Sequence, residues 1–189
     1  VEPGAFVRRV ALVRCAGQHG VDENGKATGS KMKGYYEGIE DCLAATKVAG
    51  RGPLICKFGC LGFGNCTKVC QHDAIHVVDG VAKVDHEKCV GCMMCSGVCP
   101  RNLIIPVEYD KRVVIACASK AKGAVTIRGC SAGCVGCGKC EKVCEEGAIH
   151  VDQNLAFIDY TKCTSCGKCA TVCPKHLITD AGLTAPVLE

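Results

Sequence analysis

Two stretches of this chain share one cysteine spacing, and that spacing restricts the possible folds more than any other feature. From Cys89 the sequence reads CVGCMMCSGVCP, and from Cys163 it reads CTSCGKCATVCP. Both match the CxxCxxCxxxCP run whose thiolates hold a [4Fe-4S] cubane. The runs contain Cys89, Cys92, Cys95 and Cys99, and Cys163, Cys166, Cys169 and Cys173. The spacing therefore predicts a chain that wraps around inorganic clusters.

Composition supports a bound group in place of a large apolar core. The 189 residues include 20 cysteines but only 4 Tyr, 4 Phe and no Trp. Zinc knuckles and disulfides are the alternatives for such a cysteine content. Three closely spaced cysteines with a distant fourth, repeated in pairs, favour a cubane over zinc. The sequence shows no secretory signal, which disulfides would call for, and no apolar run of the ~18 residues that a membrane helix needs.

A third run, CVGCGKCEKVC, has the same spacing but carries Glu145 where the other two have proline. In two-cluster ferredoxins the fourth cysteine of each run ligates the other cluster. The C-terminal part of the chain is therefore expected to hold two clusters whose ligands are exchanged. Their ligand sets are Cys134, Cys137, Cys140 and Cys173, and Cys144, Cys163, Cys166 and Cys169.

The chain also contains an internal repeat. The segment that starts at Gly59 matches the segment that starts at Gly133. Each has a cysteine loop, an apolar strand (74–78 or 148–151), a tight turn, a second strand and then a CP run. Each copy is typical of one ferredoxin unit. The expected fold class is α+β, with two bacterial-ferredoxin-like 2×[4Fe-4S] units and a small α/β strand-loop-helix region that joins them.

This organisation predicts five segments along the chain. They are an N-terminal strand-loop-helix region (1–53), the first ferredoxin-like unit (54–105), a strand-loop connector (106–130), the second ferredoxin-like unit (131–180) and a tail (181–189). The tight turns of the two hairpins are expected at Asp79-Gly80 and Gln153-Asn154.

The first half lacks one ligand at its usual place, because Phe63 aligns with Cys137. Cys56 is the nearest replacement, although Cys42 is an alternative, and a cluster with an open iron is another. The expected sets of the first half are Cys56, Cys60, Cys66 and Cys99, and Cys70, Cys89, Cys92 and Cys95.

Four cysteines remain, and 20 cysteines divide into five sets of four. They are Cys15, Cys42, Cys117 and Cys130. Cys15 and Cys117 follow the apolar runs 10–13 and 113–116, which are typical of buried parallel strands. Cys42 lies in 35–48, where Ile39, Leu43 and Thr46 would share one helix face. We expect a fifth cubane on these four cysteines; the alternative is four free buried thiols.

Other sequence features exclude several classes of protein. The net charge of +4 is mild and not clustered, so no nucleic-acid partner is expected. No dinucleotide-binding, P-loop, HExxH or GxSxG motif is present, so no direct small-molecule substrate and no substrate chemistry are expected. The chain is expected to carry electrons and to leave two-electron chemistry to a partner.

The sequence resembles the iron-sulfur electron-transfer subunit family of the Rnf complex, a membrane-bound, ion-translocating ferredoxin:NAD+ oxidoreductase. The resemblance spans about Arg9 to Ile178 and includes ALVRCAG, YYEGIEDCLAA, CKFGCLGFGNCTKVC, VDHEKCVGCMMCSGVCP and RGCSAGCVGCGKC. It implies that the chain accepts electrons from reduced ferredoxin and passes them to membrane subunits. It also implies a place on the cytoplasmic face of the cell membrane, held by an N-terminal membrane helix that this soluble piece lacks, along with a further cysteine-rich segment.

Two other functions fit the same motifs. One is a stand-alone polyferredoxin or the iron-sulfur subunit of another dehydrogenase or hydrogenase, and the other is a zinc-stabilised interaction module. Within the family interpretation we expect ferredoxin to dock on the C-terminal unit, guided by Lys139, Lys142 and Lys168.

Overall fold

The computed structural model describes residues 7–20, 23–24, 28–48, 50–111 and 113–179. The predicted tail lies outside these residues. The first half contains β1 (Arg9–Val13), α1 (Cys42–Lys47), α2 (Asn65–Lys68), β2 (Ile75–Val78), β3 (Val81–Val84), α3 (Met94–Gly97) and β4 (Ile104–Glu108). The second half contains β5 (Val114–Ile115), α4 (Gly123–Gly129), α5 (Lys139–Lys142), β6 (Ile149–Asp152), β7 (Leu155–Ile158), α6 (Lys168–Thr171) and β8 (Ile178–Thr179). Short helices and short strands alternate, which agrees with the expected α+β class.

Each half has a two-residue hairpin at its centre. Strands β2 and β3 pair antiparallel, and so do β6 and β7. The turn residues have positive φ angles in both hairpins, 51° and 74° at Asp79 and Gly80, and 46° and 63° at Gln153 and Asn154. Two successive positive φ angles are the signature of a type I′ turn, which matches the twist of the flanking strands. The predicted hairpins and turns are therefore confirmed.

A second antiparallel pair flanks each hairpin. Strand β1 pairs with β4 from Arg9 opposite Glu108 to Val13 opposite Ile104, and β5 pairs with β8. The expectation of parallel strands at 10–13 and 113–116 was wrong. The continuous apolar run of β1 reflects burial on both faces, because β1 pairs with β4 and also packs against β3. Burial on both faces makes any strand apolar, whatever the direction of its neighbour.

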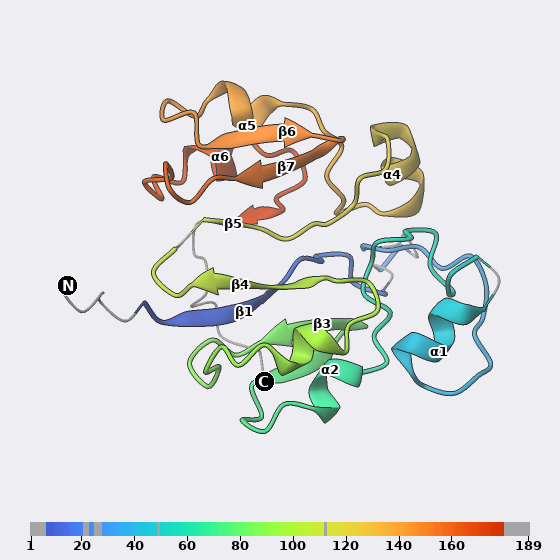
Figure 1. Cartoon of the computed structure of the whole chain (residues 1–189). Coiled ribbons are helices and arrows are strands. Elements are labelled where there is room, and N and C mark those ends of the chain that lie inside the picture. The colour runs from blue at the N-terminus through green and yellow to red at the C-terminus, as the bar shows by residue number, and fades with distance from the viewer. Residues whose placement is uncertain (1–6, 21–22, 25–27, 49, 112, 180–189) are drawn as a thin grey trace.

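The two halves stack with the β1–β4 and β5–β8 pairs between the two hairpins (Figure 1). The guanidinium of Arg14 donates to the carbonyl of Cys117 at 3.1 Å, which joins the ends of the two equivalent strands β1 and β5. Backbone hydrogen bonds from Lys31 to Gly129 and from Ser131 to Gly29, both 2.9 Å, fasten the segment after β1 to the loop after α4. The contact region between the two halves, called the join below, is therefore a packed part of the fold.

A long segment between β1 and α2 distinguishes the first half. It carries α1, which begins at Cys42 because Asp41, with extended backbone, caps the helix by accepting from the backbone N–H of Ala44 at 2.7 Å. The expected helix over 35–48 was therefore too long. Cys42 and Ala45 form its buried face, while Leu43 is exposed and Ile39, also exposed, lies before the helix.

Among the described residues no helix is both long enough and apolar enough to cross a bilayer.

Candidate metal centres

The second half brings together the two groups of cysteines that the spacing predicts. Loops before α5 and α6, together with residues after those helices, place four cysteines around each of two cavities. The second inner set is Cys134, Cys137, Cys140 and Cys173. The second outer set is Cys144, Cys163, Cys166 and Cys169. Because α5 carries Cys140 to the inner cavity and precedes Cys144 of the outer one, the two sets are neighbours.

The first half repeats this arrangement with one change. The first outer set contains the expected Cys70, Cys89, Cys92 and Cys95. The first inner set is Cys42, Cys60, Cys66 and Cys99. Cys56, which was expected here, does not line this cavity, and Cys42 takes its place. The alternative left open at the sequence level is therefore the arrangement that the structure has.

A small apolar core carries Cys42 to the cavity. Cys42 and Ala45 of α1 pack against the buried Leu54 and Leu61, with Tyr36 and Phe63 at the edge. The side chain of Asn65, at the start of α2, fixes the helix by accepting from the backbone N–H of Cys42 at 2.8 Å. Phe63 stands where the second half has a cysteine and stacks on Tyr36, with ring centroids 5.2 Å apart. An aromatic contact thus replaces the missing ligand, and α1 supplies the thiol.

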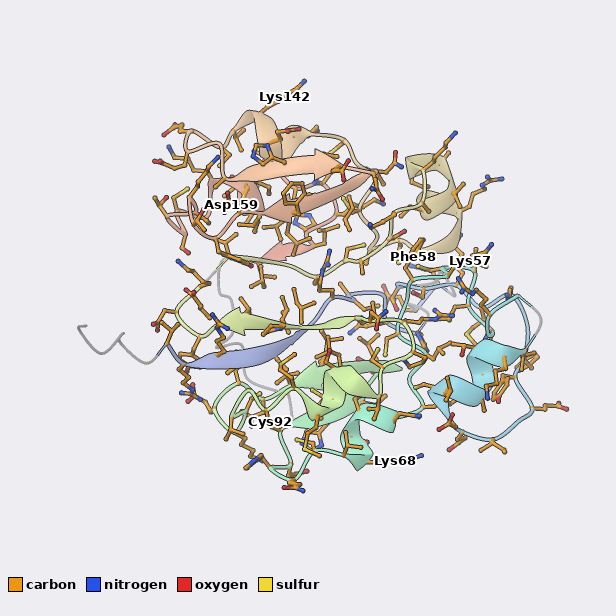
Figure 2. The ribbon with its side chains drawn as sticks, viewed as in Figure 1. Lys57, Phe58, Lys68, Cys92, Lys142 and Asp159 are labelled. Atoms are coloured by element: carbon orange, nitrogen blue, oxygen red, sulfur yellow. The ribbon has the colours of Figure 1, made fainter. Side chains whose placement is uncertain are left out.

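Cys56 lies instead with the three other cysteines that the ferredoxin units leave unused. The central set is Cys15, Cys56, Cys117 and Cys130. Gly17, two residues after Cys15, lies directly against Sγ of Cys130, and Gly129 lies against the backbone nitrogen of Cys56. Arg14, beside Cys15, donates to the carbonyl of Cys117 at 3.1 Å. Lys57 and Phe58, which follow Cys56, are found at the level of the join between the halves (Figure 2).

The central set follows the internal repeat. Cys56 and Cys130 each stand four residues before the first loop cysteine of their half, Cys60 or Cys134. The backbone N–H of Cys60 donates to Sγ of Cys15 at 3.3 Å, and that of Cys134 donates to Sγ of Cys117 at 3.4 Å. Each half therefore contributes two cysteines in equivalent positions. One cysteine of each pair, Cys15 or Cys117, accepts a hydrogen bond from the backbone of an inner-set cysteine of its own half.

The donor atoms around the sulfurs suit thiolate ligands. Equivalent N–H groups of Ala74 and Ala148 donate to Cys70 and Cys144 at 3.4 and 3.3 Å, and that of Ala11 donates to Cys89 at 3.4 Å. Hydrogen bonds of this kind stabilise negative sulfur and tune iron-sulfur clusters. In the described part of the chain no three His, Cys, Asp or Glu side chains converge as the ligands of one metal ion would. The two inner and two outer cysteine sets line largely apolar cavities, and these residues fit a [4Fe-4S] group.

Burial raises the pKa of several of these thiols. Desolvation raises the pKa of Cys15 and of Cys66 to about 12, and that of Cys140, the equivalent of Cys66, to about 11. Ligand thiols must lose their protons to bind iron, so iron binding releases protons here. Of the cysteines that line the two inner cavities, only Cys137 of the second is exposed.

Solvent reaches three of the twenty cysteines freely, namely Cys92, Cys137 and Cys166. Figure 2 shows Cys92 at one end of the molecule and Lys142 at the opposite end. Of the lysines expected to guide ferredoxin, Lys168 is bonded to Glu145 at 2.7 Å, and this hydrogen bond raises its pKa. The charge of Lys168 is thus largely compensated by its neighbour.

Family models match both halves of the chain. A 4Fe-4S dicluster domain matches residues 133–177, and a 4Fe-4S binding domain matches residues 82–105. The chain thus contains two ferredoxin-type domains.

Three curated relatives align over most of the chain, and each is the B-subunit of its complex. That of the Na+-translocating ferredoxin:NAD+ oxidoreductase complex of Acetobacterium woodii is 37% identical, over 86% of this chain and 46% of its own length. The B-subunit of the proton-translocating ferredoxin:NAD+ oxidoreductase complex of Clostridium ljungdahlii is 40% identical, over 80% of this chain and 50% of its own length. The B-subunit of the ion-translocating oxidoreductase complex of Methanosarcina acetivorans is 38% identical, over 67% of this chain and 48% of its own length. The chain spans about half the length of these relatives.

Proposed function

We propose that this chain, a member of the B-subunit family of Rnf-type ferredoxin:NAD+ oxidoreductase complexes, is the multi-cluster electron carrier of such a complex. Each of the five cysteine sets would hold a [4Fe-4S] cluster, which accepts and releases one electron when bound. Reduced ferredoxin is the proposed donor, and the membrane subunits of the complex are the proposed acceptors. The proposed location is the cytoplasmic face of the membrane.

The observation that carries this proposal is the continuous order of the cysteine sets. The helices α2 and α3 connect the first outer and first inner sets, because Cys66 and Cys95 lie on these helices and Cys70 and Cys99 follow them. Hydrogen bonds connect each inner set to the central set. The order is first outer, first inner, central, second inner, second outer. The central set lies between the two ferredoxin-type domains, so a cluster bound there would let electrons pass from one domain to the other. This position supports a single electron-transfer path through the whole chain.

The chain itself supplies three things in this function. Its cysteines fix the positions of the bound groups, its N–H donors stabilise the thiolates, and its apolar walls keep water from the buried sets. Exposed Cys92 and Cys166 belong to the outer sets and give the two ends of the order access to partners. No side chain is needed to make or break bonds in a substrate.

Removing a central ligand tests the proposal. In the anaerobically reconstituted chain we expect Cys117→Ala to lower the iron content from about 20 to about 16 per chain, with full retention of the other four clusters. In the complete complex we expect the same change to lower ferredoxin-dependent NAD+ reduction more than tenfold. Lys120→Ala, an exposed change three residues further along the same loop, is the matched control and should leave both values unchanged.

Two outcomes would contradict the proposal. Full activity of the Cys117→Ala complex would mean that electrons do not cross the join, as in a carrier whose two domains act separately. Stoichiometric zinc in the anaerobically prepared wild-type chain would instead indicate an interaction module.

A further inference from the structure

One half-buried cation lies between two of the cysteine sets. Arg101 follows the CP run of the first half, and its side chain lines the first inner cavity. Its guanidinium donates to the carbonyls of Cys56 at 3.0 Å and Arg51 at 2.6 Å, and also to that of Gly59 at 2.5 Å. These bonds hold the charge against the loop that joins Cys56 of the central set to Cys60 of the first inner set.

No carboxylate of the described residues forms an ion pair with this guanidinium. Carbonyl oxygens supply only partial charges, so these hydrogen bonds leave most of the positive charge uncompensated. The thiols of Cys42, Cys60, Cys66 and Cys99 line the same cavity as Arg101, and they would be thiolates if a cluster were bound.

Among the described residues of the second half, no arginine takes the position equivalent to Arg101. The repeat places Lys175 after the second CP run, where its ammonium makes one hydrogen bond, at 2.9 Å, to the carbonyl of Ser131. Lys is a point charge on a flexible stem, whereas Arg holds a planar fork in one orientation. The positive charge is therefore fixed more firmly on the side of the first half.

We propose that Arg101 is a positioning residue that raises the reduction potentials of the clusters held by the first inner and central sets. A fixed positive charge beside a cluster stabilises the reduced form, which carries one more negative charge. The step concerned is one electron gained by an oxidised cluster, with no proton or bond transferred. Electrons would then reside on the first inner and central clusters in preference to the outer clusters at the two ends of the molecule. This inference rests on the proposed function.

The test is a redox titration of anaerobically reconstituted protein, followed by electron paramagnetic resonance. At a poise where these two clusters are half reduced in the wild type, we expect Arg101→Gln to lower their reduced-to-oxidised ratio about tenfold, or 59 mV for a one-electron couple. Arg101→Lys keeps the charge and should restore most of the ratio. Lys142→Gln removes the same charge from an exposed site at one end of the molecule and should change neither cluster (Figure 2).

Each result is decisive for Arg101. Potentials that stay unchanged in Arg101→Gln with full iron would overturn the proposal, and so would loss of iron in Arg101→Gln, because the residue would then be purely structural. The iron content and the number of clusters in the wild type are measured in the same samples. A wild type with fewer than five clusters would count against the proposed function, independently of any shift caused by Arg101.

Discussion

The two halves of the molecule share one scaffold but complete their inner cysteine sets differently. In the second half the loop before α5 supplies Cys137, which is exposed. In the first half Phe63 takes that position, and the buried Cys42 arrives from α1 in a segment that the second half lacks. None of the four cysteines that line the first inner cavity is exposed, whereas the second inner cavity has one exposed cysteine. The fourth cysteine that lines such a cavity can thus come from a distant segment while the cavity is kept.

The largest expected effect comes from moving the fourth cysteine of the first inner set from position 42 to position 63. Cys42→Ala should lose one cluster, or about 4 irons per chain, because the first inner set is left with three thiols. Adding Phe63→Cys to that variant should restore the iron, since position 63 matches Cys137 in spacing. Iron and sulfide analysis measures both. Full iron in Cys42→Ala alone would contradict the role of Cys42.

A smaller effect is expected from the core that carries α1. Leu54 is 1% exposed and packs with Cys42, Ala45 and Leu61. Leu54→Ala should destabilise the protein by about 2–5 kcal/mol, because it leaves a cavity under the helix. Urea unfolding followed by the visible absorbance of the clusters measures this loss. Leu43→Ala, on the exposed face of the same helix, should change the stability by less than about 0.5 kcal/mol.

The cap of α1 provides a weaker test. Asp41 accepts hydrogen bonds from the backbone of Ala44 and from the side chain of Asn65. Asp41→Ala should cost about 1 kcal/mol of stability, the usual effect of losing an N-cap. The same urea titration measures it, with the exposed Asp152→Ala as the control. Equal stability of the two variants would mean that α1 needs no cap.

The smallest effect concerns pH and separates the two inner sets. Burial raises the pKa of Cys66 to about 12 and that of Cys140 to about 11, so protons compete with iron at both inner sets. The first set has the buried Cys42 where the second has the exposed Cys137, so we expect the stronger competition in the first half. As the pH is lowered during reconstitution, the first inner cluster should be lost before the second. Electron paramagnetic resonance of the reduced samples distinguishes the two clusters. Loss in the reverse order would contradict the stronger competition in the first half.

Much of this architecture could be predicted from cysteine spacing and turn residues. The two CP runs, the third run from Cys134 and the internal repeat predict both outer sets and the second inner set. Asp79-Gly80 and Gln153-Asn154 indicate the two hairpins, because these signals are local in sequence. The choice between Cys42 and Cys56 could not be made this way. It depends on how a long segment folds back onto α2 through Asn65 and Leu54, and nothing in the spacing encodes that contact. The sequence feature that indicates a displaced cysteine is Phe63, which stands where the second half has Cys137.

Strand direction was predicted wrongly for a related reason. The apolar run of β1 indicates burial on both faces, which parallel strands often have, but here β3 and β4 produce the same burial with antiparallel pairing. The helix around Cys42 was extended too far because the capping role of Asp41 was not recognised.

The most direct test of the five-cluster arrangement is a crystal structure of the anaerobically reconstituted chain, with iron located by its anomalous scattering. We predict five separate iron sites, with Sγ of Cys42 bound in the first half and Sγ of Cys56 bound at the join together with Cys15, Cys117 and Cys130. Iron bound to Cys56 in the cavity of Cys60, Cys66 and Cys99, or a join without iron, would contradict this arrangement.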